Sequence, residues 1–326
     1  MPQYKYTHCQ ILISLVLILS SAGTVAAGSA VWIDSDPACN QARTNDVDDC
    51  WALLLALGSQ TLDIRGISSV FGNSSEELSY TTATSLLQKF DFSNAAPSVY
   101  RGAVVPLGSS SPNTNPAVEA LAAALEKEAL TIIALGPLTN IASLVINHPD
   151  RIANIKQVIV VAGQRPDKKL GFYPGKSKLF HVHDFNFRKD VRAVDTILSS
   201  PIPVALVPFE VAQVINIDEY DLTQMKQGGY QARWLGEISA PWLGLWQQDF
   251  QATGFHPFDS LAIGFASNPE LFSCESIPAK IEHKQSLFMN SRDKLVVSHE
   301  YSEQNLVRYC YAVDPFFKSH MLEILR

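Results

Sequence analysis

The sequence predicts a single α/β domain built on a mostly parallel central sheet with helices on both faces. Short apolar segments that are typical of buried strands alternate with segments of helical spacing along most of the chain. The strand segments are apolar at nearly every position, as expected for strands that are covered on both faces. No internal repeat, low-complexity tract or clear linker interrupts residues 31–326, so one domain accounts for them.

The first elements set this pattern. Residues 31–33 form an apolar strand that ends in acidic residues, and residues 51–57 form a helix that ends at Gly58. The spacing of apolar residues predicts further strands at 64–70, 98–100, 131–135, 158–162 and 204–207. It predicts helices at 76–90, 117–129, 140–147 and 190–198. Beyond these, we expect helix over 214–257, strands with turns over 277–313 and a final helix over 314–325.

Composition and charge exclude several classes of protein. The 326 residues include 25 Lys and Arg against 32 Asp and Glu, which gives a formal net charge of −7. This acidic balance argues against a nucleic-acid-binding surface, which normally needs a basic excess. With 47% hydrophobic and 17% charged residues, the chain is expected to fold around a large core rather than to be disordered.

Residues 1–30 have the pattern of a secretory signal peptide. Lys5 precedes an apolar run at 11–19, and small residues follow it as far as Ala30. We expect cleavage near Ala27 or Ala30, which would release a secreted or lumenal protein without a membrane contact. The alternative is an uncleaved anchor, but the second half of the segment is too small and polar to span a bilayer well.

Four cysteines remain after such a cleavage, and an oxidising compartment would allow three complete pairings. Cys274 with Cys310 is the preferred pair, because both lie in the strand-rich last quarter. Cys39 with Cys50 is the other pair that the sequence allows, although Cys50 in an apolar helix is equally well explained as a buried thiol. The absence of a CxxC pair argues against a zinc ribbon.

An acidic cluster follows the first strand. Adjacent carboxylates repel one another and raise one another's pKa, and a hard divalent cation removes that cost. Carboxylate, carbonyl and water oxygens together suit Ca²⁺. The other interpretation is a helix N-terminus, where Asp is favourable, but this accounts for only one or two of the acids. The five residues are Asp34, Asp36, Asp46, Asp48 and Asp49.

The same residues carry a resemblance to a known family. Asp34-Ser-Asp36-Pro, followed by Asp48-Asp49-Cys-Trp-Ala-Leu, resembles the DxDPGxDDAxAL signature of the inosine/uridine-type nucleoside hydrolases, the N-ribohydrolases. Four further segments follow in the family's order: VFGN at 70–73 resembles VxGN, ALGPLTNIA at 134–142 resembles GPLTNIA, DFN at 184–186 with Asp190 resembles EFN…D, and FDSLA at 258–262 resembles HDP-A. Together these matches extend over nearly the whole mature chain.

The resemblance implies a hydrolase with an α/β fold that binds one Ca²⁺ at the strand ends. Such an enzyme cleaves ribonucleosides to free base and ribose. Asp36 is implied as the general base on a metal-bound water, in a carboxylate-rich pocket that stabilises the ribosyl cation. Implied metal ligands are Asp36, Asp49, the backbone carbonyl of Leu135, and Asp259. Implied substrate-binding residues are Asp48, Asn73 and Asn186 at the ribose hydroxyls, and Asp184 near the sugar. Family members are often dimers or tetramers, so a homodimer or homotetramer is also implied.

Three departures from the family pattern affect these expectations. The signature places the Asp pair directly after Pro-Gly-x, whereas here twelve positions separate Asp36 from Asp48. The extra loop, 38–47, must bulge out if the pair is to reach the metal. Asp184 replaces the usual Glu, and Phe258 replaces the usual His. His256 is therefore the candidate leaving-group acid, with an ordinary loop histidine as the alternative.

Two other functions remain open at this point. One is a non-catalytic nucleoside or sugar binder on the same fold. The other is a phosphatase with Asp34 as nucleophile, because Asp34-x-Asp36 at a strand end resembles haloacid-dehalogenase-type enzymes; this leaves the Asp48–Asp49 pair unexplained. The sequence does not reveal the preferred base, since its aromatic residues near 242–258 either stack on a purine or belong to the core. Secretion with this chemistry would indicate salvage of extracellular purine or pyrimidine nucleosides.

Overall fold

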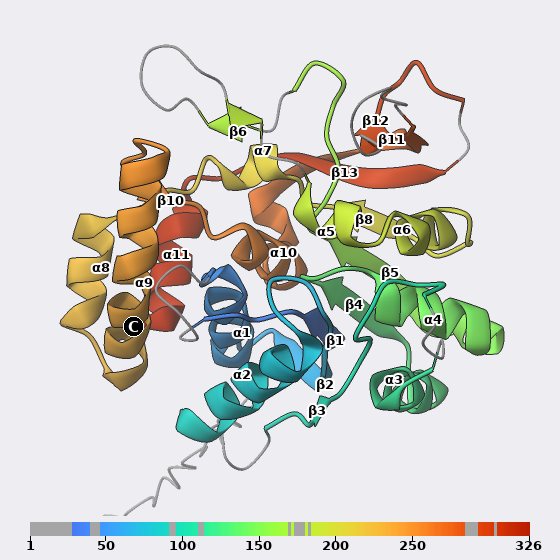
Figure 1. Cartoon of the computed structure of the whole chain (residues 1–326), viewed down its shortest axis with the longest axis horizontal. Helices are drawn as coiled ribbons and strands as arrows, with labels where there is room; N and C mark the ends of the chain where they lie inside the picture. The colour runs from blue at the N-terminus through green and yellow to red at the C-terminus, as the bar shows by residue number, and fades with distance from the viewer. Residues whose placement is uncertain are drawn as a thin grey trace, which may run out of the picture.

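The computed structural model describes most of the chain and is organised around one large sheet (Figure 1). The described residues are 28–39, 46–90, 96–109, 114–168, 171–172, 180–181, 184–283, 293–302 and 305–326. Residues 1–27 of the expected signal peptide and residues 40–45 of the inserted loop therefore lie outside the described part. Among the described helices, none has both the length and the apolar character needed to cross a membrane.

Nine strands form the central sheet, in the order β12-β11-β13-β8-β5-β4-β1-β2-β3. The seven strands from β13 to β3 pair in parallel, whereas β11 is antiparallel to both β13 and β12. The bounds are β1 Ser29–Ser35, β2 Leu62–Ser69, β3 Val99–Tyr100, β4 Leu130–Ala134, β5 Ile155–Val160, β8 Val204–Leu206, β11 Phe272–Glu282, β12 Lys294–Val297 and β13 Leu306–Val313. Two small antiparallel pairs are β6 Gly171–Phe172 with β7 Phe180–His181, and β9 Ile217–Asp218 with β10 Gly254–Phe255.

The strand order reverses at β1, and this positions the site. From β1 the chain adds β2 and β3 on one side, and it then crosses back to add β4, β5 and β8 on the other. At such a switch point the connections leave the carboxyl ends of neighbouring strands in opposite directions, which opens a crevice for ligands. The acidic end of β1 lies at this switch point.

Alternating strand residues build a core on each face of the sheet. In β1, Val31 and Ile33 pack into the core that contains α1, α10 and α11, whereas Ala30 and Trp32 pack into the core that contains α3, α4 and α6. Figure 1 shows these two groups of helices on opposite sides of the sheet, with α8 and α9 outside α1 and α11. Both strand faces are therefore apolar, as predicted.

Helices α1 to α4, α6 and α11 begin and end within about three residues of the predicted positions, whereas α10 was not predicted. Their bounds are α1 Asp48–Gly58, α2 Glu76–Lys89, α3 Pro116–Lys127, α4 Thr139–Asn147, α5 Phe185–Lys189, α6 Val191–Leu198, α7 Phe209–Ala212, α8 Glu219–Lys226, α9 Tyr230–Asp249, α10 Phe258–Ser267 and α11 Phe316–Leu325, with 3-10 turns at Pro149–Asn154 and Pro269–Leu271. Local capping explains several starts: Ser75 caps α2, Asn115 caps α3, and Asp218 forms a capping box with Asp221 in α8.

The fold class is confirmed, and two element predictions are wrong. The 214–257 region is not continuously helical, because β9 and β10 pair on either side of α8 and α9. The first helix begins at Asp48 rather than at residue 51, so the Asp pair occupies its first turn. Short α5 and α7 were not predicted, because four or five residues are too few to show a helical period.

The structure contains the preferred disulfide and also the second pair that the sequence allowed. Cys274 and Cys310 face each other on the paired strands β11 and β13, with their Cα atoms 3.9 Å apart. Cys39 and Cys50 join the segment after β1 to α1, with their Cα atoms 6.3 Å apart. Cys50 is therefore a disulfide cysteine, and its interpretation as a free buried thiol is wrong.

Candidate active site

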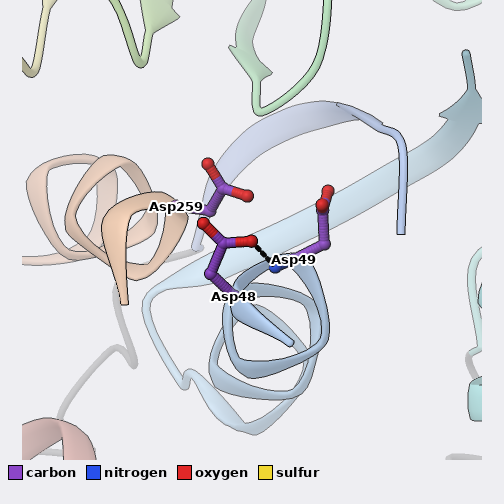
Figure 2. Close-up of side chains that lie close together, drawn as sticks. All are labelled: Asp48, Asp49 and Asp259. Carbon is purple, nitrogen blue, oxygen red and sulfur yellow. Dashed lines mark hydrogen bonds between the residues drawn. The ribbon is translucent and has the colours of Figure 1, made fainter. Parts of the chain in front are cut away.

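Three buried carboxylates converge at the carboxyl edge of the sheet, near the end of β1. Asp48 and Asp49 come from the first turn of α1, and Asp259 comes from the first turn of α10. Each offers an oxygen atom, and these oxygens all lie within 4.8 Å of one another. Figure 2 shows the three side chains gathered in this way, with Asp48 accepting a 2.9 Å hydrogen bond from the Asp49 N–H. The inserted loop thus does not prevent the Asp pair from meeting the late aspartate.

Asp36, the first residue after β1, is tied directly to this cluster. Its N–H donates to Asp49 Oδ1 over 3.1 Å, and its own Oδ2 accepts the Asn73 N–H over 2.7 Å. The Asn73 side-chain amide donates to Asp49 Oδ2 over 2.9 Å, and Ser35 Oγ donates to Asp49 Oδ1 over 2.6 Å. The end of β1, the loop after β2 and the start of α1 are therefore held together by the carboxylates themselves.

One oxygen of Asp36 has no hydrogen-bond partner within the described chain. This atom, Oδ1, is fully buried. Gly72 and Gly136 lie against this carboxylate, where no side chain would fit. A Cβ added at Gly72 would lie 1.8 Å from Asp36 Oδ2, and one added at Gly136 would lie 2.7 Å from Oδ1. A buried carboxylate oxygen without a partner is costly, so its position indicates a ligand.

The electrostatics of the cluster also indicate a cation. Burial is the main cause that raises the pKa of Asp36, Asp48 and Asp259 well above the usual value. The charge of Asp49 raises the pKa of Asp36 and Asp259 further, and the charge of Asp259 raises that of Asp48. Burial raises the pKa of Asp49 to about 6, against the hydrogen bond from Ser35. Repulsion among these carboxylates is relieved if a divalent cation lies between them.

Asp46 is a further acid of the cluster to which the sequence analysis assigned no role. Its Oδ1 accepts the Asp48 N–H over 3.2 Å, and its charge helps to raise the pKa of Asp36, Asp48, Asp49 and Asp259. It belongs to the inserted loop, so no family segment pointed to it. The signal that could have found it is its place in the same acidic run, two residues before Asp48.

Asp34 has different partners from the other acids of the run. It is fully buried and accepts hydrogen bonds from Ser68 Oγ and from the side-chain amide of Asn140. Burial raises its pKa to about 7, and these two hydrogen bonds act in the opposite direction. Oδ1 of Asp34 therefore links β1, β2 and α4 internally, whereas its Oδ2 is buried without a hydrogen-bond partner in the described chain.

The remaining sugar-binding candidates lie beside β4 and α5. The side-chain amide of Asn186 donates to the Leu135 carbonyl over 2.5 Å, so a predicted sugar-binding residue adjoins a predicted metal ligand. Both oxygens of Asp184 accept backbone N–H groups, from Gly163 over 2.8 Å and from Phe187 over 3.1 Å. Burial raises the pKa of Asp184 to about 6. Asp184 caps α5 and in this way fixes the helix that carries Asn186.

His256, three residues before Asp259 in the sequence, lies in an aromatic environment. Its Nδ1–H donates to the Ile215 carbonyl over 2.8 Å, and burial lowers its pKa. The ring centroids of Trp246 and Phe258 lie 5.2 and 6.0 Å from that of His256, and Phe258 stacks on Phe209. Trp246 and Phe255 are buried core residues, in agreement with the core alternative for these aromatics, whereas Phe258 is only partly buried.

Comparison with known proteins identifies the family to which a chain with this site belongs. The family model described as inosine-uridine preferring nucleoside hydrolase matches residues 31–317. The chain belongs to this nucleoside hydrolase family. It is thus an enzyme of the class that cleaves the N-glycosidic bond of ribonucleosides, and the family depends on a metal ion.

Relatives of this nucleoside hydrolase are distant but match over most of their length. It is 24% identical over 283 residues to the non-specific ribonucleoside hydrolase RihC of Salmonella agona, which covers 79% of this chain and 85% of the relative. It is 25% identical over 288 residues to an uncharacterized protein of Schizosaccharomyces pombe, covering 79% and 86% of the two chains.

Solved structures share the fold of the nucleoside hydrolase. A plant nucleoside hydrolase superposes with a TM-score of 0.72 at 18% identity, covering 91% of this chain and 97% of the other. A purine-preferring ribonucleoside hydrolase from Gardnerella vaginalis gives 0.72 at 17% identity, covering 91% and 98%. The oxygen-only donors of the cluster, together with the partnerless Asp36 Oδ1, fit the metal that the family requires.

Proposed function

We propose that this nucleoside hydrolase is a secreted, calcium-dependent enzyme that cleaves ribonucleosides to free base and ribose. The observation that carries the proposal is the meeting of Asp48, Asp49 and Asp259, from distant parts of the chain, beside the partnerless Oδ1 of Asp36. The substrate that fits this site is a small nucleoside, because its ribose diol can supply the further oxygen ligands that Ca²⁺ prefers.

Four groups of the chain would hold a single calcium ion. They are the carboxylates of Asp36, Asp49 and Asp259 and the backbone carbonyl of Leu135. A bound ion of this kind lowers the pKa of a coordinated water and orients the sugar diol. Ca²⁺ is favoured over Mg²⁺ because it accepts six to eight oxygen ligands in flexible geometry, whereas Mg²⁺ demands a tighter octahedron.

Asp36 accepts the proton of the attacking water in this proposal. The Asn73 N–H holds Oδ2, so the carboxylate is oriented with Oδ1 available for the proton. The surrounding carboxylates stabilise the positive charge that develops on the ribose as the glycosidic bond breaks. Asp48, Asn73 and Asn186 bind the ribose hydroxyls, which holds C1′ in place for attack. Asp184, near the sugar, keeps the Asn186 helix in position.

His256 is the proposed proton donor to the departing base: its Nδ1–H is bonded to the Ile215 carbonyl, so the donated proton is the one on Nε2 of the protonated ring. We expect His256→Asn to lower kcat/KM for inosine about tenfold or more, because the base must leave with a proton. The asparagine amide keeps a donor toward the Ile215 carbonyl, so the local structure is retained. Steady-state kinetics with p-nitrophenyl riboside are the control, since p-nitrophenolate leaves without a proton and should be released at the wild-type rate. Equal losses on both substrates would remove this role from His256.

Secretion and assembly complete the proposal. The pattern of residues 1–30 supports export, and two disulfides support an oxidising compartment. A cut after Ala27 leaves β1 whole, whereas a cut after Ala30 would remove its first two residues. We propose export to the extracellular space or the secretory lumen, nucleoside salvage there, and a homodimer or homotetramer as the assembly.

The export proposal predicts the N-terminus of the mature protein. Expression of the full chain in a eukaryotic host should place the protein in the medium, beginning at Gly28, because small residues precede this position. Intact-mass spectrometry of the purified protein measures this. A cell-retained protein that still begins at Met1 would contradict the proposal.

The activity is tested with inosine, uridine and p-nitrophenyl phosphate in parallel. We expect free base and ribose from a nucleoside and no phosphate from the ester. A chelator should abolish the reaction, and added Ca²⁺ should restore it. Nucleoside binding without turnover would instead show a non-catalytic binding protein, and phosphate release would show a phosphatase.

A further inference from the structure

Cys39, near the start of the inserted loop, is disulfide-bonded to Cys50, three residues after the end of that loop. Cys39 follows Asp36 by three residues, and Cys50 follows Asp49 by one. The disulfide between them has a sequence separation of 11, and both cysteines are buried. A covalent bond therefore joins the two segments that carry the N-terminal carboxylates, within three residues of Asp36 and one residue of Asp49 in the sequence.

The described hydrogen bonds between these two segments are made by the proposed metal-ligand side chains themselves. Ser35 Oγ and the Asp36 N–H both donate to the carboxylate of Asp49. Val47, at the N-cap position of α1, makes no capping hydrogen bond, and the first-turn N–H groups of Asp48 and Asp49 are instead bonded to the carboxylates of Asp46 and Asp48. The start of this helix is thus held by acidic side chains of the cluster, whereas the residue at the N-cap position holds the starts of α2, α3 and α8.

A long loop between two ligand-bearing segments has an entropic cost. If the segments are free, bringing Asp36 and Asp49 together restricts the loop, and this cost opposes metal binding. A disulfide across the base of the loop imposes most of that restriction before the metal arrives. The ligands are then held in place in advance, and more of the binding free energy is expressed as affinity.

We propose that the Cys39–Cys50 disulfide is a positioning element for the metal site, which holds Asp36 next to Asp49 and so raises the affinity for the ion. This inference rests on the proposed function only for the identity of the ion, Ca²⁺. It makes the two cysteines positioning residues rather than catalytic ones, since neither contacts the reacting atoms.

The second disulfide provides a matched control. Cys274–Cys310 has a sequence separation of 36 and bridges β11 and β13, which are already joined by a ladder of paired residues. By loop length alone it constrains the unfolded chain more than Cys39–Cys50 does. Its loss should therefore reduce thermal stability at least as much, without moving any carboxylate of the cluster.

The test compares Cys39→Ala/Cys50→Ala with Cys274→Ala/Cys310→Ala in the full mature protein. Calorimetric titration with Ca²⁺ alone, without substrate, should show a Kd about 10- to 100-fold higher for the first variant and nearly unchanged for the second. At saturating Ca²⁺, kcat of the first variant should recover to near the wild-type value. Equal Kd values for the wild type and the first variant would overturn the inference, as would equal losses in both variants.

A second measurement uses the native protein and does not depend on the folding of a variant. In reduction by dithiothreitol, its two thiols are oxidised to a cyclic disulfide, and Cys39–Cys50 is reduced to two thiols. Because coupling is reciprocal, bound Ca²⁺ must stabilise the disulfide by the same factor by which the disulfide strengthens Ca²⁺ binding. Alkylation and mass spectrometry should show a shift of the Cys39–Cys50 equilibrium with Ca²⁺, and none for Cys274–Cys310. A Ca²⁺-independent equilibrium would overturn the inference.

These outcomes separate the inference from the proposed function. A wild-type protein that binds Ca²⁺ with the expected disulfide coupling but does not cleave nucleosides would overturn the function and leave the positioning role. Cleavage with normal Ca²⁺ binding in the Cys39/Cys50 variant would overturn the positioning role alone. A wild-type protein that binds no Ca²⁺ would overturn both.

Discussion

Asp36→Asn is expected to lower kcat for nucleoside cleavage by about 10³-fold or more, because it removes both the proposed proton acceptor and an anionic metal ligand. The amide is close to the carboxylate in shape, and it relieves the repulsion from Asp49 that raises the pKa of Asp36. The fold should therefore survive, with a melting temperature equal to or above that of the metal-free wild type. Single-turnover kinetics and thermal unfolding measure the two effects.

Asp190→Asn is the matched control for this prediction. Asp190 is also a buried aspartate, but it caps α6 and accepts hydrogen bonds from the Leu107 N–H and from Thr139 Oγ1, away from the cluster. Its neutralisation weakens charge-assisted hydrogen bonds, which should lower the free energy of unfolding by about 1–2 kcal/mol and leave kcat within a few-fold. Near-wild-type turnover in Asp36→Asn would remove Asp36 from the mechanism.

Asp259→Asn is expected to abolish the effect of calcium on both activity and stability. Ca²⁺ at 100 times its Kd should stabilise the wild-type fold by about 2.7 kcal/mol, and a chelator should remove this stabilisation. Without Asp259, the ion loses the carboxylate that α10 contributes, so calorimetric melting curves with and without chelator should coincide.

Asp259→Asn is also expected to change the stability of the metal-free protein, and the direction of this change tests the metal role more sharply. Burial and the charges of Asp49 and Asp36 raise the pKa of Asp259, so the ionised form destabilises the metal-free fold. At neutral pH the asparagine variant should be more stable than the metal-free wild type, by about 1 kcal/mol or more. A variant that melts below the metal-free wild type would show that Asp259 supports the fold directly rather than through an ion.

The secondary structure and the first half of the site follow from local sequence. Continuous apolar runs are a local signal, and they predicted β1 to β5 and β8 within a few residues. Asp36, Asp48 and Asp49 lie close together in the chain, so their density alone indicated a metal site. The spacing of Cys274 and Cys310 within one strand-rich region likewise predicted a disulfide that the structure contains.

The completion of the site depends on contacts that no local pattern encodes. Asp259 reaches the cluster only because α10 packs against α1 on one face of the sheet, and before the structure only the family resemblance connected them. The backbone partners of Asp184 and the environment of His256 depend in the same way on segments distant in sequence.

Apolar period and local acid density were sufficient to determine an α/β sheet with carboxylates at the end of its first strand. The tertiary structure alone decided that Asp34 turns to Ser68 and Asn140, and that Cys50 bonds to Cys39. The physical reason is that the direction of a side chain at a strand or helix end depends on what packs against it, and this is set by the whole fold.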